Sequence, residues 1–107
     1  NTVDDNFLSK MKNDAFLINT SRGDLVDNNA LKNALLKGKI AGAGLDVFTP
    51  EPLEKDNPLL DIKLKDKLIL TPHIAGITHL TVERIYKNIV ENTQNIIHGR
   101  ELKNKVN

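Results

Sequence analysis

Three short, largely apolar runs constrain the fold of this chain more than any other feature of its sequence. They span Ala15–Ile18, Ile40–Val47 and Lys67–Thr71. The first run has no polar alternation, which is typical of a parallel strand that is covered on both faces. Helical patterns precede the first run, separate the first two and follow the last. This order predicts an α/β fold with a parallel sheet and right-handed crossovers.

Three segments carry apolar side chains at helical spacing. Residues 3–12 follow Thr2, which forms a possible capping box with Asp5, and a second helix begins after Asp27, a favourable N-cap. The longest helix is predicted over residues 79–98, before a glycine. Its apolar stripe consists of Val82, Ile85, Tyr86, Ile89, Val90, Ile96 and Ile97.

The length of the chain, 107 residues, is enough for one domain with one core. Three strands are few for a stable open sheet, so other segments of a longer protein, or a second copy, are expected to complete it. The chain also starts at Asn1 rather than at a methionine. We therefore expect a fragment of a larger protein.

Composition excludes several classes of function. The formal net charge is +1 with both signs interspersed, which predicts no nucleic-acid surface and no polybasic membrane anchor. Cysteine is absent, which excludes disulfides and thiolate metal sites and fits a cytoplasmic location. No apolar run approaches the roughly 20 residues of a membrane-spanning helix, and no leader is evident.

The segment Gly44–Pro52 combines a strand with a candidate functional group. It begins as an apolar run and ends in two prolines that hold Glu51 between them. Proline fixes its own φ and biases the preceding residue toward an extended conformation, so Glu51 lies on a stiffened segment. Arg22 and His73 likewise follow the other two strands. Open parallel sheets place their chemistry at this end of the strands.

Arg22 is a candidate for binding an anionic ligand. A guanidinium binds a carboxylate through two parallel hydrogen bonds, which fixes orientation as well as charge. The adjacent Gly23 allows a turn that other residues resist. The alternative is a surface arginine paired with Asp24 or Asp27.

His73 is the natural general acid or base, because the pKa of a histidine lies nearest working pH. Pro72 restricts its backbone, and Glu51 is a candidate to bond one ring nitrogen, fixing the tautomer and stabilising the imidazolium. The alternatives are a histidine that satisfies a backbone group at a strand end, and a solvated loop acid. Proximity of Glu51 to His73 discriminates between these interpretations.

Other polar residues are weaker candidates. Asp46 lies inside an apolar run, which is costly unless it is paired, and it is either a ligand or a helix cap. His79 is a second candidate base near a helix start, and His98 is most simply structural. The three histidines are too scattered for a metal site, so no metal is expected. A pocket for a polar ligand is expected to include Thr20, Ser21 and the backbone N–H groups of Ala75 and Gly76.

Taken together, the motifs Ile18–Gly23, Gly44–Pro52 and Leu70–Gly76 resemble the D-isomer-specific 2-hydroxyacid dehydrogenases in order and spacing. The resemblance runs from about residue 3 to the end of the chain. It implies the C-terminal half of a nucleotide-binding domain with a parallel three-layer, Rossmann-like sheet and a C-terminal helix. Residues 1–107 would then form a partial NAD(P)-binding domain.

The resemblance implies hydride transfer between NAD(P)H and C2 of a 2-oxo or 2-hydroxy acid. Arg22 matches the arginine that binds the substrate carboxylate, His73 the acid/base and Glu51 its carboxylate partner. Asp46 matches a residue near the nicotinamide carboxamide. The implied cofactor-binding set is Thr20, Ser21, Arg22, Asp46, His73, Ala75 and Gly76.

The chain also lacks parts of the family pattern. The Gly-x-Gly-x-x-Gly loop and the acid that binds the adenosine ribose are absent. The chain is therefore expected to be inactive alone, with NAD as cofactor and NADP not excluded. The substrate class stays open among glycerate, phosphoglycerate, glyoxylate, lactate and bulkier acids, and a homodimer is expected.

Two alternatives to an enzyme remain from the sequence. Corepressors of the C-terminal-binding-protein type share the fold and keep the same three catalytic positions, so a non-catalytic dinucleotide-binding or interaction module is the second interpretation. The third is a plain α/β structural domain, which requires three matched strand-end motifs to coincide by chance.

Overall fold

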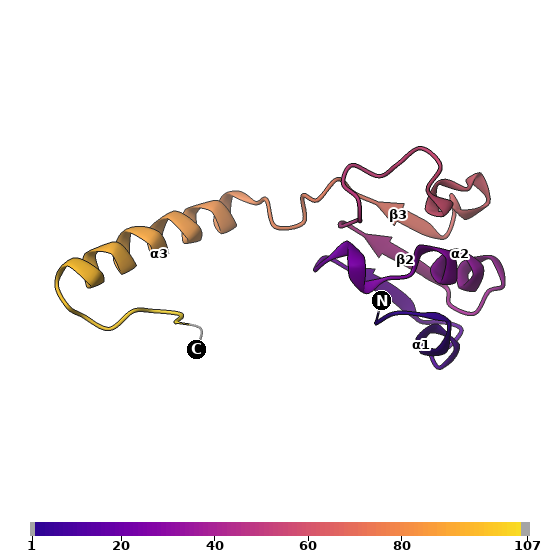
Figure 1. Ribbon diagram of the computed structural model, residues 1–107, viewed down its shortest axis with the longest axis horizontal. Coiled ribbons are helices and arrows are strands. Elements are labelled where there is room, and N and C mark those ends of the chain that lie inside the picture. Colours follow the sequence, from indigo (N-terminus) through magenta and orange to yellow (C-terminus); the bar gives the residue numbers. More distant parts are fainter. Residues whose placement is uncertain (1, 106–107) are drawn as a thin grey trace. The chain divides into compact units, whose positions relative to one another are not determined.

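The computed structural model describes residues 2–105 and divides into two compact units, one ending at Ala75 and one beginning at Gly76. The first unit holds a sheet of three parallel strands, β1 (Phe16–Asn19), β2 (Gly42–Leu45) and β3 (Leu68–Leu70), in the order β1-β2-β3 (Figure 1). The predicted parallel α/β architecture is confirmed.

The first helix, α1 (Asp5–Ser9), is shorter than predicted. Its N-cap is Asp4, whose side chain accepts the N–H of the third helical residue, so the predicted capping role of Thr2 is wrong. The N–H groups of Thr2 and Val3 instead bond the loop before α2, and Val3 forms an isolated parallel bridge with Val26. Pairing with that loop therefore keeps these residues extended.

The second helix, α2 (Asn28–Leu36), is the one predicted after Asp27. One carboxylate oxygen of Asp27 accepts the N–H groups of Asn29 and Ala30 at 2.9 and 3.0 Å, which satisfies the first free donors of the helix. At the other end, Gly38 adopts a φ of +66°, a conformation that glycine tolerates without steric cost. Local sequence thus sets both ends of α2.

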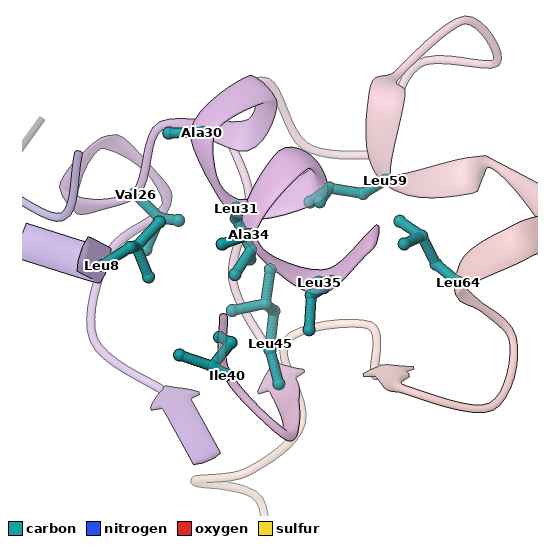
Figure 2. Close-up of a cluster of buried hydrophobic side chains, with 11 residues drawn as sticks. Leu8, Val26, Ala30, Leu31, Ala34, Leu35, Ile40, Leu45, Leu59 and Leu64 are labelled. Carbon is teal, nitrogen blue, oxygen red and sulfur yellow. The ribbon is translucent and has the colours of Figure 1, made fainter. Parts of the chain in front are cut away.

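The hydrophobic core lies between α2 and one face of the sheet. Figure 2 shows Leu31, Ala34 and Leu35 of α2 directed toward Ile40 and Leu45. Burial of each leucine or isoleucine side chain contributes about 1.5–3 kcal/mol. The full buried cluster comprises Leu8, Val26, Ala30, Leu31, Ala34, Leu35, Ile40, Ala43, Leu45, Leu59 and Leu64.

The opposite face of the sheet carries large apolar side chains that remain exposed. Phe16, Ile18 and Ile69 are exposed by 67, 67 and 70%. Successive residues of a strand point to opposite faces, so these three share one face while Leu17 and Leu68 pack against the core. Residues 2–75 therefore supply the sheet and one helical layer, and a third layer is not seen among them.

The long connection from β2 to β3 is anchored rather than loose. It contains two short 3₁₀ helices, η2 (Pro58–Leu60) and η3 (Ile62–Leu64). The Asn57 side chain accepts the N–H of Leu59 at 3.0 Å. Leu59 and Leu64 are buried in the core, so they tether the segment that begins at the Glu51 turn.

The second unit contains α3 (His79–Ile97), whose N-cap Thr78 accepts the N–H of Thr81. The residues after α3 fold back along it, where Asn92 exchanges two hydrogen bonds with Lys103 and Asn95 donates to the carbonyl of Glu101. The predicted apolar stripe of α3 is exposed. Among residues 2–105, no helix has the length and apolar character needed to cross a bilayer.

Candidate active site

The candidate site lies at the carboxyl ends of the three strands. Because β1, β2 and β3 are parallel, the loops that follow them emerge at the same edge of the sheet. Residue 22 lies in the loop after β1, residues 46 and 51 follow β2, and residue 73 follows β3. The topology therefore gathers groups that lie up to 51 positions apart in the chain.

Glu51 and His73 form the central contact of this edge. Nδ1 of His73 lies 2.8 Å from Oε2 of Glu51, and the other carboxylate oxygen accepts the N–H of Phe48 at 2.8 Å. Pro50 and Pro52 both follow cis peptide bonds. The bond to His73, followed by that to Phe48, lowers the pKa of Glu51. The carboxylate therefore stays ionised near neutral pH, and the predicted proximity is present.

The side chain of Asn19, the last residue of β1, organises the loop that follows this strand. Its side-chain oxygen accepts the N–H of Ser21 at 3.0 Å, and its amide donates to the carbonyl of Arg22 at 2.9 Å. Asn19 is buried, with 7% of its surface exposed. Its place on the buried face, two positions after Leu17, was the available signal, since a buried amide needs partners.

Arg22 precedes a short 3₁₀ helix, η1 (Gly23–Leu25), and its guanidinium donates to the carbonyl of Ser21 at 2.6 Å. Within the described range, no ion pair joins Arg22 to Asp24 or Asp27. Asp27 instead caps α2. The guanidinium thus retains donors for an anionic ligand.

Gly23 is required by close packing rather than by turn geometry. A Cβ atom at this position would overlap the carbonyl group of Phe48 and approach the N–H of Thr49. The predicted reason for this glycine, a turn conformation, is therefore wrong, because its φ is not among the positive values. The contact sets the loop of Arg22 directly against the backbone that leads to Glu51.

Arg22, Glu51 and His73 line one cavity of about 200 Å³. The same Glu51–His73 pair also borders a second, larger cavity of about 530 Å³, whose walls include Leu53, Leu60 and Leu70. Of these two cavities, Arg22 lines only the smaller one. An acid and a cation converge with a histidine there, so the smaller cavity is the better match for a carboxylate-bearing substrate.

Asp46 is buried, with 4% of its surface exposed, and its carboxylate turns toward the loop after β3. It accepts the hydroxyl of Thr71 and the N–H groups of Ile74 and Ala75. The hydroxyl bond is the largest cause of the lowered pKa of Asp46, and the two backbone bonds add to it. The alternative prediction of a helix cap is wrong, because the carboxylate caps a loop.

The remaining predicted residues are less closely engaged. Thr20 and Ser21 lie exposed in the loop after β1. His79 and Gly76 belong to the second unit. His98 ends α3, and its Nδ1 lies 2.7 Å from the carbonyl of Gln94, as a structural histidine would. In the part of the chain that the structure describes, no three His, Asp or Glu side chains gather as a metal site requires.

Comparison with known proteins identifies the family. Residues 1–75 match the family model described as D-isomer specific 2-hydroxyacid dehydrogenase, NAD binding domain. The chain belongs to the D-isomer specific 2-hydroxyacid dehydrogenases. The resemblance drawn from the three strand-end motifs is thereby confirmed, and an NAD-type cofactor agrees with the matched domain.

Curated members of the dehydrogenase family align along most of the chain. Glyoxylate reductase of Korarchaeum cryptofilum is 45% identical over 100 residues, which cover 94% of this chain and 29% of that protein. A probable 2-ketogluconate reductase of Dictyostelium discoideum is 48% identical over 99 residues, covering 92% of this chain and 29% of that protein. The chain therefore spans less than a third of these dehydrogenases.

Solved structures of the family have the same fold. The D-isomer specific 2-hydroxyacid dehydrogenase of Xanthobacter autotrophicus Py2, complexed with NADPH, matches with a TM-score of 0.80 and 37% identity over 98% of this chain and 41% of that one. D-lactate dehydrogenase of Lactobacillus jensenii with NAD+ matches with a TM-score of 0.78 and 31% identity over all of this chain and 35% of that one. The Rossmann-type fold is therefore confirmed.

Proposed function

We propose that this chain supplies the acid/base half of an NAD(P)-dependent dehydrogenase that interconverts a small 2-oxo acid and its 2-hydroxy acid. The observation that carries the proposal is the contact of His73 with Glu51 beside Arg22, on a cavity of about 200 Å³. The names of relatives that reduce glyoxylate and 2-ketogluconate support the same reaction class.

Arg22 binds the substrate carboxylate in this proposal. Its loop is held by the Asn19 side chain and lies against the Phe48 backbone, so the guanidinium starts from a restricted position. Two-pronged binding of a carboxylate fixes the orientation of the neighbouring C2 carbonyl. The positive charge also stabilises the negative charge that grows on the carbonyl oxygen during reduction.

His73 moves the proton. Because Nδ1 faces Glu51 at 2.8 Å, Nε2 is the ring nitrogen left for the substrate. In reduction, the imidazolium donates its Nε2 proton to the C2 oxygen, and in oxidation the neutral ring accepts it back. The ionised Glu51 holds the Nδ1–H and stabilises the charged ring.

The chemistry of the donor set fits the nicotinamide end of an NAD-type cofactor, which supplies or accepts the hydride when bound. A carboxamide offers N–H donors and one carbonyl acceptor. A carboxylate has about four acceptor positions, of which Asp46 uses three, so one remains on Oδ2. Thr20 and Ser21 add exposed hydroxyl groups, and Arg22, His73, Ala75 and Gly76 complete the proposed set. The choice of NAD or NADP lies outside these residues.

The activity is proposed for a larger, cytoplasmic enzyme that works as a homodimer. The relatives are more than three times as long as the matched segment, and the chain is proposed to be inactive alone. The exposed face formed by Phe16, Ile18 and Ile69 supports this, because an apolar face of that kind needs covering by further protein. The substrate is proposed to be a small acid such as glyoxylate.

The test uses the protein that carries this chain. Wild type and His73→Ala are assayed with glyoxylate, hydroxypyruvate, pyruvate and 2-ketogluconate, with NADH and with NADPH. We expect turnover by wild type and a loss of kcat of about 100- to 10,000-fold in His73→Ala, the usual contribution of a general acid. His98→Ala, altered at the C-cap of α3, is the matched histidine control and should keep its activity.

Two results would contradict the proposal. Full activity of His73→Ala, with an unchanged circular dichroism spectrum, would remove His73 from the chemistry and shift attention to His79 or to residues elsewhere in the protein. Absence of turnover by wild type on every acid, with dinucleotide binding intact, would favour the non-catalytic binding module that shares this fold.

A further inference from the structure

Thr71 connects three parts of the site through one residue. Its N–H donates to the carbonyl of Leu45 at 3.0 Å, its hydroxyl donates to Oδ1 of Asp46 at 2.6 Å, and its carbonyl accepts the N–H of His73 at 3.0 Å. Thr71 therefore ties the end of β3 to the end of β2 and closes the turn that carries His73.

Asp46 holds the same turn from the other side of His73. Its Oδ1 also accepts the N–H of Ile74 at 2.9 Å, and its Oδ2 accepts the N–H of Ala75 at 2.8 Å. The carboxylate is buried, so these bonds are strong and their loss would leave a buried charge without partners. Residues before and after His73 are thus fixed to one anchor.

His73 itself has an unusual backbone conformation. Its φ of +55° lies in the left-handed region, which a residue other than glycine rarely adopts because it is sterically strained. Such a conformation persists where the surroundings determine it. On one side, the His73 N–H is bonded to the carbonyl of Thr71. On the other side, the N–H groups of Ile74 and Ala75 are bonded to Asp46, so both flanks of His73 are fixed.

We propose that Thr71, acting through Asp46, is the positioning residue that holds His73 in its left-handed turn, so that its imidazole meets Glu51. Thr71 is not a catalytic residue, because its hydroxyl is engaged by Asp46. The kinetic consequence rests on the proposed function, whereas the conformational consequence does not. Nothing in the sequence motif alone separates this role from that of a simple strand-end threonine.

The first test needs no variant. Amide hydrogen exchange of the whole protein reports whether Asp46 binds the loop. Ile74 is 49% exposed and Ala75 is also exposed, yet we expect both of their amides to exchange slowly, because each donates to the buried carboxylate. Exchange of both amides at the rate of an unstructured loop would overturn the proposal.

The second test compares Thr71→Val, which keeps the shape but removes the hydroxyl, with Thr71→Ser, which keeps the hydroxyl. Long-range ¹H–¹⁵N NMR of the His73 ring reports its Nδ1–H bond to Glu51. We expect Thr71→Val to lose that signal and to lower kcat about 10- to 100-fold, with little change in dinucleotide affinity. Thr71→Ser should restore both, and Thr93→Val in α3 should resemble wild type.

The outcomes separate this proposal from the proposed function. An unchanged His73 signal and an unchanged pH profile of kcat in Thr71→Val would overturn the positioning role, even if His73→Ala is inactive. Full activity of His73→Ala would overturn the proposed function, while slow exchange at Ile74 and Ala75 and loss of the His73 signal in Thr71→Val would still support the positioning role. If Thr71→Val fails to fold, Thr71→Ala, which also removes the hydroxyl, is measured with the same His73 signal and the same pH profile of kcat, and an unchanged result there would overturn the positioning role.

Discussion

The His73 imidazole and the Glu51 carboxylate meet at 2.8 Å although 22 positions separate them in the chain. Each approaches the other from the end of a different strand. Glu51 is held by the N–H of Phe48, and His73 by the turn that Thr71 and Asp46 fix. Backbone contacts on both sides therefore set the positions of Glu51 and His73, in addition to the bond between the two side chains.

Glu51→Gln tests the charge in this pair. Glutamine retains an oxygen that accepts the Nδ1–H of His73 but carries no negative charge to stabilise the imidazolium. We expect kcat to fall roughly 10- to 100-fold, with the KM of the 2-oxo acid little changed, because the loss falls on proton transfer. Steady-state kinetics measure this. Glu54→Gln, a change in an exposed acid of the same connection, should be close to wild type.

Gly23→Ala tests the contact between the Arg22 loop and the Phe48 backbone. The added methyl group overlaps the carbonyl of Phe48, so the two segments must separate. We expect a loss of about 1–3 kcal/mol in the free energy of unfolding and a fall in kcat/KM. Urea unfolding and steady-state assays measure the two effects.

Gly44→Ala is the control for Gly23→Ala. Its added methyl group would lie 3.2 Å from the end of the Ile18 side chain, which is exposed and able to move. It should therefore be tolerated better. Equal stability losses in the two variants would contradict the role assigned to Gly23.

Asn19→Leu tests the amide that organises the Arg22 loop. Leucine has a similar volume, but it leaves the N–H of Ser21 and the carbonyl of Arg22 without their partner. We expect a destabilisation of about 1 kcal/mol for each of the two hydrogen bonds lost, and a raised KM for the 2-oxo acid. Asn19→Asp keeps the acceptor for the N–H of Ser21, so its stability and its KM should lie between those of wild type and Asn19→Leu. Wild-type KM in Asn19→Leu would separate Asn19 from substrate binding.

The stability of the protein should fall in acid because of lowered carboxyl pKa values. The Thr71 hydroxyl lowers the pKa of Asp46, the His73 bond that of Glu51, and the N–H of Lys63 that of Asp61. A lowered folded-state pKa means that, as pH falls, the unfolded chain binds more protons than the folded protein does. The contribution of these carboxylates to the free energy of unfolding is therefore full above the ordinary carboxyl pKa of about 4. It is lost as pH falls through their folded-state pKa values.

Urea unfolding of wild type and Asp46→Asn from pH 7 to pH 2.5 measures this dependence. The variant should be less stable at pH 7, and the difference should shrink as pH falls through the lowered folded-state pKa of Asp46. Asp14→Asn, altered in the exposed turn before β1, should stay close to wild type throughout. A difference between wild type and Asp46→Asn that is constant with pH would contradict the expectation.

Local sequence determined much of this protein by itself. Short-range propensities account for the α2 caps at Asp27 and Gly38 and for the helical turn after Asn57. Local periodicity marks the alternating helical and apolar runs from which the parallel sheet was expected. These features depend on residues close in the chain, so a reading of the sequence finds them. The strand-end motifs of Arg22, Glu51 and His73 also identified the family.

Only the tertiary structure decided how those residues are held. The buried Asn19 that binds the Arg22 loop, the close contact of Gly23 with Phe48, and the Thr71–Asp46 bond behind His73 join segments through long-range packing. The bonded residues can lie far apart in the chain: 29 positions separate Asp46 from Ala75. Which polar group satisfies which buried donor depends on strand register and loop path, and neither is encoded in the local spacing of residues.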